Sequence, residues 1–258
     1  MCVSKGVVLL GGCGGLGSFF VASILKMGWR VCVADISIDN LNKLKASLPV
    51  SLDLLVDGYL QCDVSELKEV ESVFTQASAL YDEFDVVFCA AVTSEGLHNF
   101  DSSDLFSEHL WRKTIDVNLS GAFNVAKTCD YFFRKNKSGN LILVSSIYGF
   151  CAPDRKLYQG ESIDNYPGYS ASKAGLHGLT LWLSSFWGDS GFRVNTLVPG
   201  GVFNGHSTSF VRKYSEKTSL NRMAEPLDVW GGLKFLLSDD SSYMTGQALV
   251  IDGGYAAR

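Results

Sequence analysis

The chain has 258 residues, of which 47% are apolar and 19% charged, and its formal net charge is −5. This length suits one globular domain with a large core, and the lack of a basic tail or Lys/Arg-rich patch argues against nucleic acid as a partner. Seven cysteines without a CxxC pair are typical of buried free thiols, so we expect a cytoplasmic protein without disulfides or a bound metal.

The stretch from Gly6 to Trp29 is mostly apolar, and Lys26 is its only charged residue, so it could be mistaken for a signal peptide or a membrane span. Glycines cluster in it, and it divides into a strand-like half and a helix-like half. We therefore expect no membrane segment and no membrane partner.

Short apolar, β-branched runs alternate with stretches of helical periodicity along the chain. Such runs are typical of strands buried on both faces of a parallel sheet. The expected strands are residues 7–10, 30–35, 59–64, 85–90, 140–146, 192–198 and 247–252. The alternation predicts a single α/β domain over residues 1–258, with a Rossmann-type doubly wound parallel sheet of about seven strands and helices on both faces.

A glycine-rich segment, LLGGCGGLGSFF, follows the first expected strand and opens the first helix. Glycine permits a tight turn and lets a pyrophosphate approach the backbone, and the helix N-terminus supplies N–H groups with partial positive charge. The residues expected to bind a dinucleotide here are Gly11, Gly14, Gly15, Leu16 and Gly17.

An acidic residue, Asp35, ends the second expected strand 18 residues after Gly17. A carboxylate at this place accepts hydrogen bonds from the adenosine ribose and repels a 2′-phosphate, and the next residue, Ile36, is not basic. This pattern favours NAD over NADP. The alternative is that Asp35 only caps the following helix.

The segment NYPGYSASK contains two tyrosines and a lysine. An unperturbed tyrosine has a pKa of about 10, so a general base near neutral pH needs a pKa lower by about 3. An ammonium about 4 Å away has an effect of that size, and on a helix the residue four positions on can supply it. Only Tyr169 has a cation there, Lys173; the other tyrosines nearby are Tyr148, Tyr158 and Tyr166.

A second polar group should hold the substrate oxygen beside the tyrosine. Ser145 and Ser146 end a buried strand, at the carboxyl edge where α/β sheets bind ligands. Asn118 falls on a helical stripe, where asparagine is unfavourable unless its side chain is hydrogen-bonded. A catalytic residue and a satisfied core asparagine are both compatible with Asn118.

In this order the motifs resemble those of the short-chain dehydrogenase/reductase family over essentially the whole chain. GGCGGLG resembles the family's cofactor loop. DVN resembles the segment that carries the family's asparagine, VSS the segment with its serine, and YSASK the segment with its tyrosine and lysine. CDV resembles the segment that contacts adenine, RVNTLVPGGV the segment that lines the nicotinamide, and YMTGQALVIDGG the closing strand.

The resemblance implies an NAD-dependent enzyme that interconverts a secondary alcohol and a ketone by hydride transfer. It implies Tyr169 as general acid/base, Lys173 to activate it and hold the nicotinamide ribose, Ser146 to orient the substrate oxygen, and Asn118 to fix a relay water. Further cofactor contacts would come from Asp63, Val64, Ala90, Ala91, Pro199, Gly200 and Val202, and substrate contacts from Tyr148, Tyr158 and His206.

Three departures from the family pattern stand out. Leu10 replaces the threonine before the glycine loop, and CAAV (residues 89–92) replaces the usual Asn-Asn-Ala-Gly. Ser146 and Tyr169 are 23 residues apart, which is longer than is usual in the family. The insertion, residues 147–168, either hangs over the substrate or is a solvated loop without ligand contact.

A second segment on the substrate side, the lid (residues 203–223), is rich in basic groups and carries one acid, Glu216: the basic groups are His206, Arg212, Lys213, Lys217 and Arg222. This composition favours a polar, sugar-like substrate, with an anionic one as a variant, although such a run is also typical of a solvated face. The long loop resembles that of dehydrogenases encoded with bacterial surface-sugar and flagellin-glycosylation enzymes.

Two competing functions remain open, a 3-oxoacyl-thioester reductase, which usually uses NADPH, and a non-catalytic NAD-binding protein. The family commonly forms dimers or tetramers through the helices that carry Asn118 and Tyr169, so a homo-oligomer is expected. Four aromatic residues on these helices are candidates for that interface or for the core: Phe132, Phe133, Trp182 and Trp187.

Overall fold

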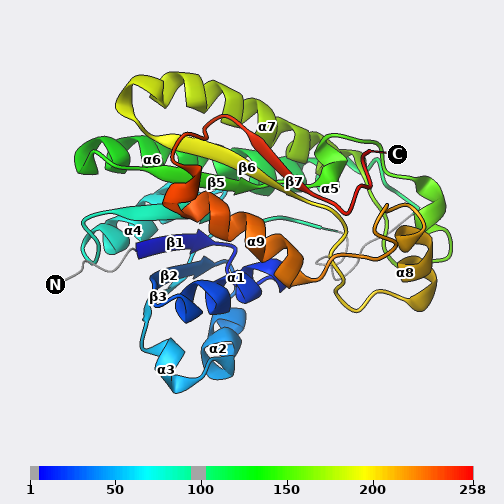
Figure 1. The fold of residues 1–258 in the computed structure, drawn as a ribbon, viewed down its shortest axis with the longest axis horizontal. Coiled ribbons are helices and arrows are strands. Elements are labelled where there is room, and N and C mark those ends of the chain that lie inside the picture. The colour runs from blue at the N-terminus through cyan, green and yellow to red at the C-terminus, as the bar shows by residue number, and fades with distance from the viewer. Residues whose placement is uncertain (1–5, 94–102, 258) are drawn as a thin grey trace.

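The computed structural model describes residues 6–93 and 103–257. In this part of the chain, seven parallel strands form one sheet in the order β3-β2-β1-β4-β5-β6-β7 (Figure 1). The strands are β1 (Gly6–Leu10), β2 (Arg30–Asp35), β3 (Val56–Gln61), β4 (Phe84–Phe88), β5 (Asn140–Val144), β6 (Arg193–Pro199) and β7 (Ala248–Ile251). The strand order reverses between β1 and β4, and ligands of such sheets bind beyond the carboxyl ends of the strands at this point. The doubly wound α/β fold is confirmed.

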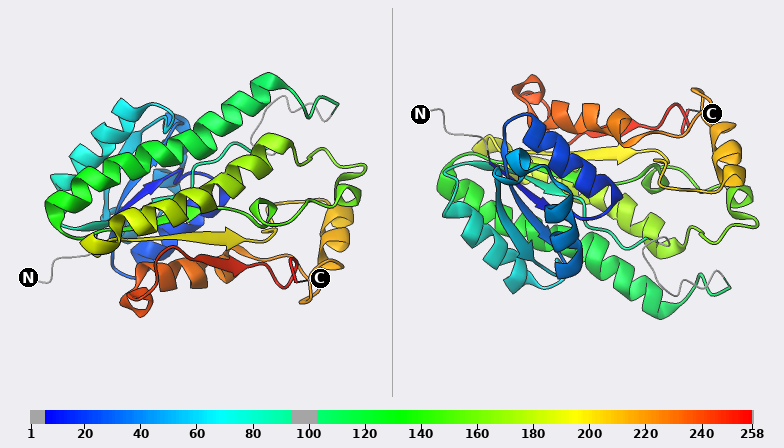
Figure 2. Two further views of the ribbon diagram at one scale, coloured as in Figure 1. Left: turned by 90° about the horizontal axis from the view of Figure 1, so that it is seen from above. Right: turned by 90° about the horizontal axis from the view of Figure 1, so that it is seen from below.

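Helices cover both faces of the sheet (Figures 1 and 2). One core lies against α1 (Gly15–Lys26), α2 (Ile38–Ser47) and α9 (Pro226–Leu237), and the other against α4 (Leu67–Ser78), α6 (Gly121–Asn136) and α7 (Pro167–Trp187). The shorter helices are α3 (Val50–Asp53), α5 (Glu108–Ile115) and α8 (Thr208–Ser215).

Alternate residues of each central strand supply the two cores, because successive side chains of a strand point to opposite faces. In β1, Val7 and Leu9 pack on the α1 side, and Val8 and Leu10 pack on the α6 side. All four are fully buried, which explains why the strand appears in the sequence as a continuous apolar run.

The third strand lies at Val56–Gln61, three residues before its predicted place at 59–64. It is the edge strand of the sheet, and its side chains are only partly buried, so its apolar pattern is weak. Its polar residue Asp57 accepts hydrogen bonds from Arg30 Nε at 2.7 Å and from the Tyr81 hydroxyl at 2.6 Å. These hydrogen bonds satisfy the carboxylate of Asp57, so an acidic residue can lie in β3 although acidic residues are rare in strands.

The apolar stretch near the N-terminus forms β1 and α1, as predicted. Within the described ranges, no helix is both long enough and apolar enough to cross a membrane. The six cysteines that the structure describes are free thiols, and Cys32, Cys62 and Cys129 are buried. Cys2 lies outside the described residues.

Candidate active site

A cavity of about 500 Å³ opens at the carboxyl ends of the strands. Its walls come from the glycine loop before α1, the end of β5, the first turns of α7, the segment after β6, the insertion and the lid. The predicted phosphate loop and the predicted catalytic segment therefore face one common space.

Two glycines of the loop are required by the backbone geometry. Gly11 has φ +80°, and a Cβ at this position would collide with the backbone of Ala90. A Cβ at Gly17 would collide with the carbonyl oxygen of Gly11. Gly14, by contrast, has open space where its Cβ would lie. The tight loop leaves room for a phosphate group at the N-terminus of α1.

We expect Gly17→Ala to lower the free energy of unfolding by about 2 kcal/mol or more, because the Gly11 backbone must move. Gly14→Ala is the matched control, and its stability without ligand should stay within about 0.5 kcal/mol of that of the wild type. Chemical denaturation of the two variants measures both values. Equal stability of the two variants would contradict the loop geometry.

Asp35 links the glycine loop to the end of β2 by a hydrogen bond. Its carboxylate accepts hydrogen bonds from Cys13 N at 2.9 Å and from Ser37 N at 3.1 Å. The cap of α2 is Ser37, whose hydroxyl accepts from Asn40 N at 3.2 Å, so the interpretation of Asp35 as a helix cap is wrong. Burial, and then the neighbouring Asp35, raise the pKa of Cys13 to about 12.

The remaining predicted cofactor residues fall into three groups. The first lines the main cavity, and its members are Ala91, Pro199, Gly200 and Val202. The second lines a separate pocket beside the edge of the sheet, and its members are Ile36 and Asp63. The third is not brought to either pocket: Val64 packs against Gly121 of α6, and Ala90 packs against Gly11.

The predicted pair of tyrosine and lysine lies on one helix, α7, and both side chains line the cavity. The Lys173 ammonium nitrogen lies 5.7 Å from the centre of the Tyr169 ring and donates to Val144 O at 2.9 Å. Lys173 is 2% exposed, and burial lowers its pKa to about 8. Ser145 Oγ donates to Lys173 O at 2.8 Å and so ties this turn of the helix to the end of β5.

Ser146 lines the same cavity from the end of β5. Its Oγ accepts a hydrogen bond from Tyr148 N at 3.2 Å and caps the short helix η3 (Ile147–Gly149). Because a hydroxyl both accepts and donates, this contact leaves its hydrogen available for a ligand.

Asn118 lies in a π-helical turn, η2 (Asp116–Ser120), and is fully buried. Its Oδ1 accepts from Val92 N at 2.7 Å, and its Nδ2 donates to Ser172 Oγ at 3.1 Å and to Val92 O at 3.3 Å. Asn118 does not line the cavity, so its geometry corresponds to the alternative of a satisfied core asparagine. Hydrogen bonds link it to the helix that carries Tyr169, since Ser172 Oγ donates to Tyr169 O at 2.8 Å.

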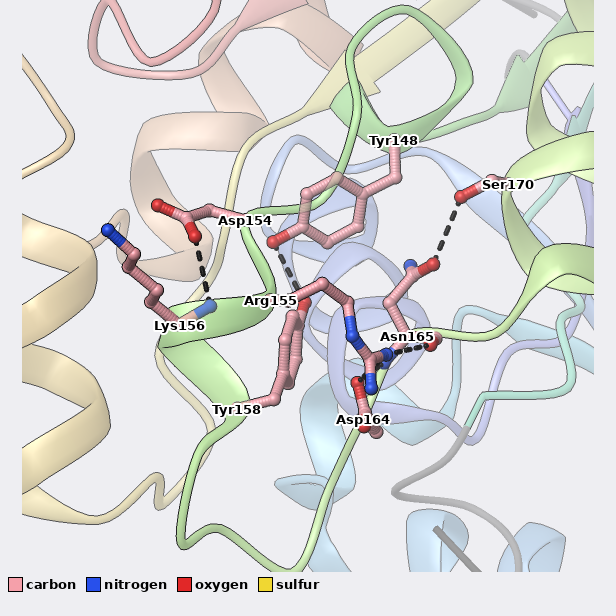
Figure 3. A network of polar contacts seen from close by, with 8 residues as sticks. All are labelled: Tyr148, Asp154, Arg155, Lys156, Tyr158, Asp164, Asn165 and Ser170. Atoms are coloured by element: carbon pink, nitrogen blue, oxygen red, sulfur yellow. Dashed lines mark hydrogen bonds and ion pairs between the residues drawn. The ribbon is translucent and has the colours of Figure 1, made fainter. Parts of the chain in front are cut away.

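The insertion forms part of the cavity wall, and its contact with a ligand stays a prediction. Tyr158, Asp164, Asn165 and Tyr166 all line the cavity. The Tyr158 hydroxyl donates to the Tyr148 hydroxyl at 2.8 Å (Figure 3), so two of the predicted substrate residues form one hydrogen-bonded pair.

The basic side chains of the lid do not point as the sequence suggested. Lys217 pairs with Asp154 at 2.6 Å, Lys213 Nζ donates to Gln159 O at 2.8 Å, and Arg222 pairs with Asp228 at 2.6 Å. Of the lid's basic residues, all of them described, His206 alone lines the cavity, where its ring stacks on Phe210 at 4.9 Å. Most of the lid's basic side chains therefore bind other segments of the chain and do not face the cavity.

Comparison with known proteins agrees with this geometry. The family model described as enoyl-(acyl carrier protein) reductase matches residues 12–256. The crystal structure of a short chain dehydrogenase from Leptospira borgpetersenii with bound NAD+ is 29% identical, with a TM-score of 0.84, and the alignment covers 98% of this chain and 92% of that one. The chain belongs to the short-chain dehydrogenase/reductase family.

Relatives within the short-chain dehydrogenase/reductase family have different names. Post-translational flagellin modification protein A of Campylobacter coli is 29% identical over 99% of both chains. A 3-oxoacyl-(acyl-carrier-protein) reductase of Thermotoga maritima is 30% identical over 97% of both. The protein is therefore an oxidoreductase, and the relatives leave its substrate open.

Several residues that line this short-chain dehydrogenase/reductase site were not predicted as site residues, among them Cys89, Asp164 and Asn165. Cys89 lines the cavity, and its thiol interacts electrostatically with Lys173; burial raises the pKa of Cys89 to about 11. Only the unusual CAAV segment pointed to it. Asp164 and Asn165 also line the cavity, and their only signal was the polar composition of the insertion.

Proposed function

We propose that the protein is an NAD-dependent dehydrogenase that interconverts a secondary alcohol and a ketone on a polar, sugar-like substrate. One observation carries the proposal: Tyr169, Lys173 and Ser146 line the same cavity as the glycine loop. This common cavity would place a bound dinucleotide and a substrate hydroxyl next to the tyrosine.

The residues fit a nicotinamide dinucleotide. The glycine loop lines the cavity with open space beside Gly14, and the Asp35 carboxylate lies beside this loop. When bound, NAD accepts the hydride from the substrate carbon. Gly200 and Val202 would contact it from the far wall of the cavity.

In the direction of oxidation, Tyr169 would accept the proton of the substrate hydroxyl. The buried ammonium of Lys173 favours the phenolate form of Tyr169, because opposite charges attract strongly where water is excluded. Ser146 would donate a hydrogen bond to the same substrate oxygen. Asn118 would contribute by position, since it links Val92 and, through Ser172, the helix that carries Tyr169.

The cofactor preference is a prediction that follows from Asp35. We expect kcat/KM with NAD to exceed that with NADP by about 100-fold, because a carboxylate beside a 2′-phosphate costs about 3 kcal/mol. Asp35→Ser should narrow the ratio to about tenfold or less, and Asp189→Ser, at an exposed acid beyond the end of α7, should leave it unchanged. A clear preference of the wild type for NADPH would overturn the prediction and favour the 3-oxoacyl-thioester reductase.

The walls of the cavity support a hydroxylated substrate. Tyr148 and Tyr158 offer both ring faces and hydroxyl groups, and Asp164, Asn165 and His206 add polar atoms. Such a combination suits sugar rings, which present C–H groups and hydroxyls together. The ion pairs of the lid favour a neutral substrate over an anionic one. The Thermotoga maritima relative supports the thioester alternative.

We also propose a homo-oligomer in the cytoplasm, where free thiols persist. Phe132, Phe133 and Trp187 are buried in the core, but Trp182 is 61% exposed and stacks on the exposed Phe186 at 4.9 Å. The helices α6 and α7 run side by side on one face (Figure 2).

We expect light scattering to show a dimer or tetramer, and Trp182→Glu to shift it to smaller species, because a charge at the centre of an apolar interface is unfavourable. A monomeric wild type at micromolar concentration would contradict the proposal.

A further inference from the structure

Two adjacent polar residues, Asp164 and Asn165, end the insertion just before α7 and line the cavity (Figure 3). They are 9% and 8% exposed, so both are more than nine-tenths buried. Asn165 lies beside the turn of α7 that carries Tyr169, because its side chain accepts a hydrogen bond from Ser170 Oγ, and both Asp164 and Tyr169 contribute to raising the pKa of Tyr158. The two residues are therefore close to the proposed reaction centre.

The protein holds one polar atom of each side chain in place. Asp164 Oδ1 accepts hydrogen bonds from Arg155 Nη1 and from Asn165 N, both at 2.7 Å. Asn165 Oδ1 accepts from Ser170 Oγ at 3.1 Å, and Arg155 Nη1 also donates to Asn165 O at 3.2 Å. These contacts fix the orientation of both side chains before any ligand arrives.

The other polar atom of each side chain has no hydrogen-bond partner among the described residues. Asp164 Oδ2 has no hydrogen-bond partner among them, and neither has Asn165 Nδ2. Neither atom is among the fully buried polar atoms without a partner, so both keep some exposed surface, and both residues line the cavity. A carboxylate oxygen only accepts hydrogen bonds and an amide nitrogen only donates them. The pair thus offers one acceptor and one donor from neighbouring positions.

This arrangement is complementary to two neighbouring hydroxyl groups. A hydroxyl both donates and accepts, so one of the pair can donate to Asp164 Oδ2 while the other accepts from Asn165 Nδ2. We propose that Asp164 and Asn165 form a subsite for a vicinal diol of the substrate, next to the carbinol carbon that Tyr169 serves. The subsite rests on the proposed dehydrogenase function and specifies its substrate class.

A purely structural role explains the arrangement less well. The insertion is already joined to the lid by Asp154 with Lys217 at 2.6 Å and by Glu161, which accepts from Ser207 Oγ at 2.6 Å. A further buried carboxylate is unfavourable for stability unless its oxygens are satisfied. The open oxygen of Asp164 would be satisfied by the hydroxyl of a ligand.

The test compares ligands that differ by one hydroxyl group. Dissociation constants of cyclohexanol and of cis- and trans-1,2-cyclohexanediol are measured by NMR titration of the protein saturated with NAD+. We expect the wild type to bind at least one diol about tenfold more tightly than cyclohexanol, since one well-placed hydrogen bond contributes about that much. This ratio compares two ligands on the same protein, so a general loosening of the loop would not change it.

Asn165→Asp keeps the size of the side chain and its contact with Ser170 but replaces the donor with an acceptor. We expect it to reduce the diol preference to less than threefold, and Asp164→Asn to do the same. Asp154→Asn is the control, because Asp154 lies in the same insertion and pairs with Lys217 outside the cavity. It should keep the tenfold ratio.

A wild type without diol preference, or variants that keep it, would overturn the subsite. If Asp164→Asn does not fold, as judged by circular dichroism, Asn165→Asp decides the result. The protein could show a diol preference that depends on both residues and yet reduce no NAD with any sugar or diol. That result would remove the dehydrogenase proposal and leave the subsite. NADH formation from sugars that is insensitive to both variants would remove the subsite alone.

Discussion

Replacing Tyr169 with phenylalanine is expected to lower kcat by about 1,000-fold, because it removes the group that exchanges the proton with the substrate oxygen. The phenylalanine ring keeps the packing of the tyrosine ring, which lies 6.2 Å from the ring of Tyr166 and 5.7 Å from the Lys173 ammonium. The affinity for NAD should therefore stay within about threefold of the wild-type value. Steady-state kinetics and a titration of NAD measure the two quantities.

Tyr166→Phe is the matched control for this variant. Tyr166 lines the same cavity, and its hydroxyl donates to Val92 O at 3.1 Å. Its loss removes a structural hydrogen bond and no proton carrier, so kcat should fall by less than about tenfold. Full turnover by Tyr169→Phe would show that the assigned mechanism is wrong.

Replacing Lys173 with methionine is expected to lower kcat by about 100-fold or more and at the same time to stabilise the protein without ligand. The buried ammonium is unfavourable for folding, since the pKa of Lys173 falls from 10.5 to about 8, which corresponds to about 3 kcal/mol. The lost hydrogen bond to Val144 O offsets about 1 kcal/mol of this gain. We expect a net increase of about 2 kcal/mol in the free energy of unfolding at pH 7.

The stabilisation should depend on pH in a defined direction. Below the folded pKa of about 8, Lys173 carries its proton in both states, so the full cost of burying the charge is present. Between about 8 and 10.5 the unfolded chain binds more protons than the folded one, and the wild type gains stability as pH rises. The advantage of Lys173→Met over the wild type should shrink across this window. Denaturation of both proteins at pH 7 and pH 10 measures the change, and an equal difference at both values would contradict it.

The sequence predicted the parts of the site that depend on local spacing. Lys173 lies four residues after Tyr169 on one helix, and Asp35 ends a strand that begins and ends where it was predicted. Both relations hold within one element, so the chain itself determines them. The glycine loop was predictable for the same reason, since it connects β1 directly to α1.

Relations between distant segments were not predictable from the sequence. Lys217 and Asp154 are 63 residues apart and form an ion pair, so a basic run that suggested an anionic substrate serves to hold the insertion. The direction of Asp164 is set by Arg155, and that of Asn165 by Ser170. Patterns of composition identify such residues as polar but do not indicate whether they face solvent, an ion-pair partner or a ligand.

Formation of NADH from a panel of sugars, sugar phosphates, nucleotide sugars and simple secondary alcohols tests the central claim most directly. Wild type and Tyr169→Phe are compared on the same panel, with NADH read by its absorbance. We predict that the wild type forms NADH with at least one polyhydroxylated compound, and that Tyr169→Phe forms it about 1,000-fold more slowly. Turnover of hydrophobic alcohols and ketones with none of the sugars or sugar phosphates, or equal rates for the two proteins, would contradict the account.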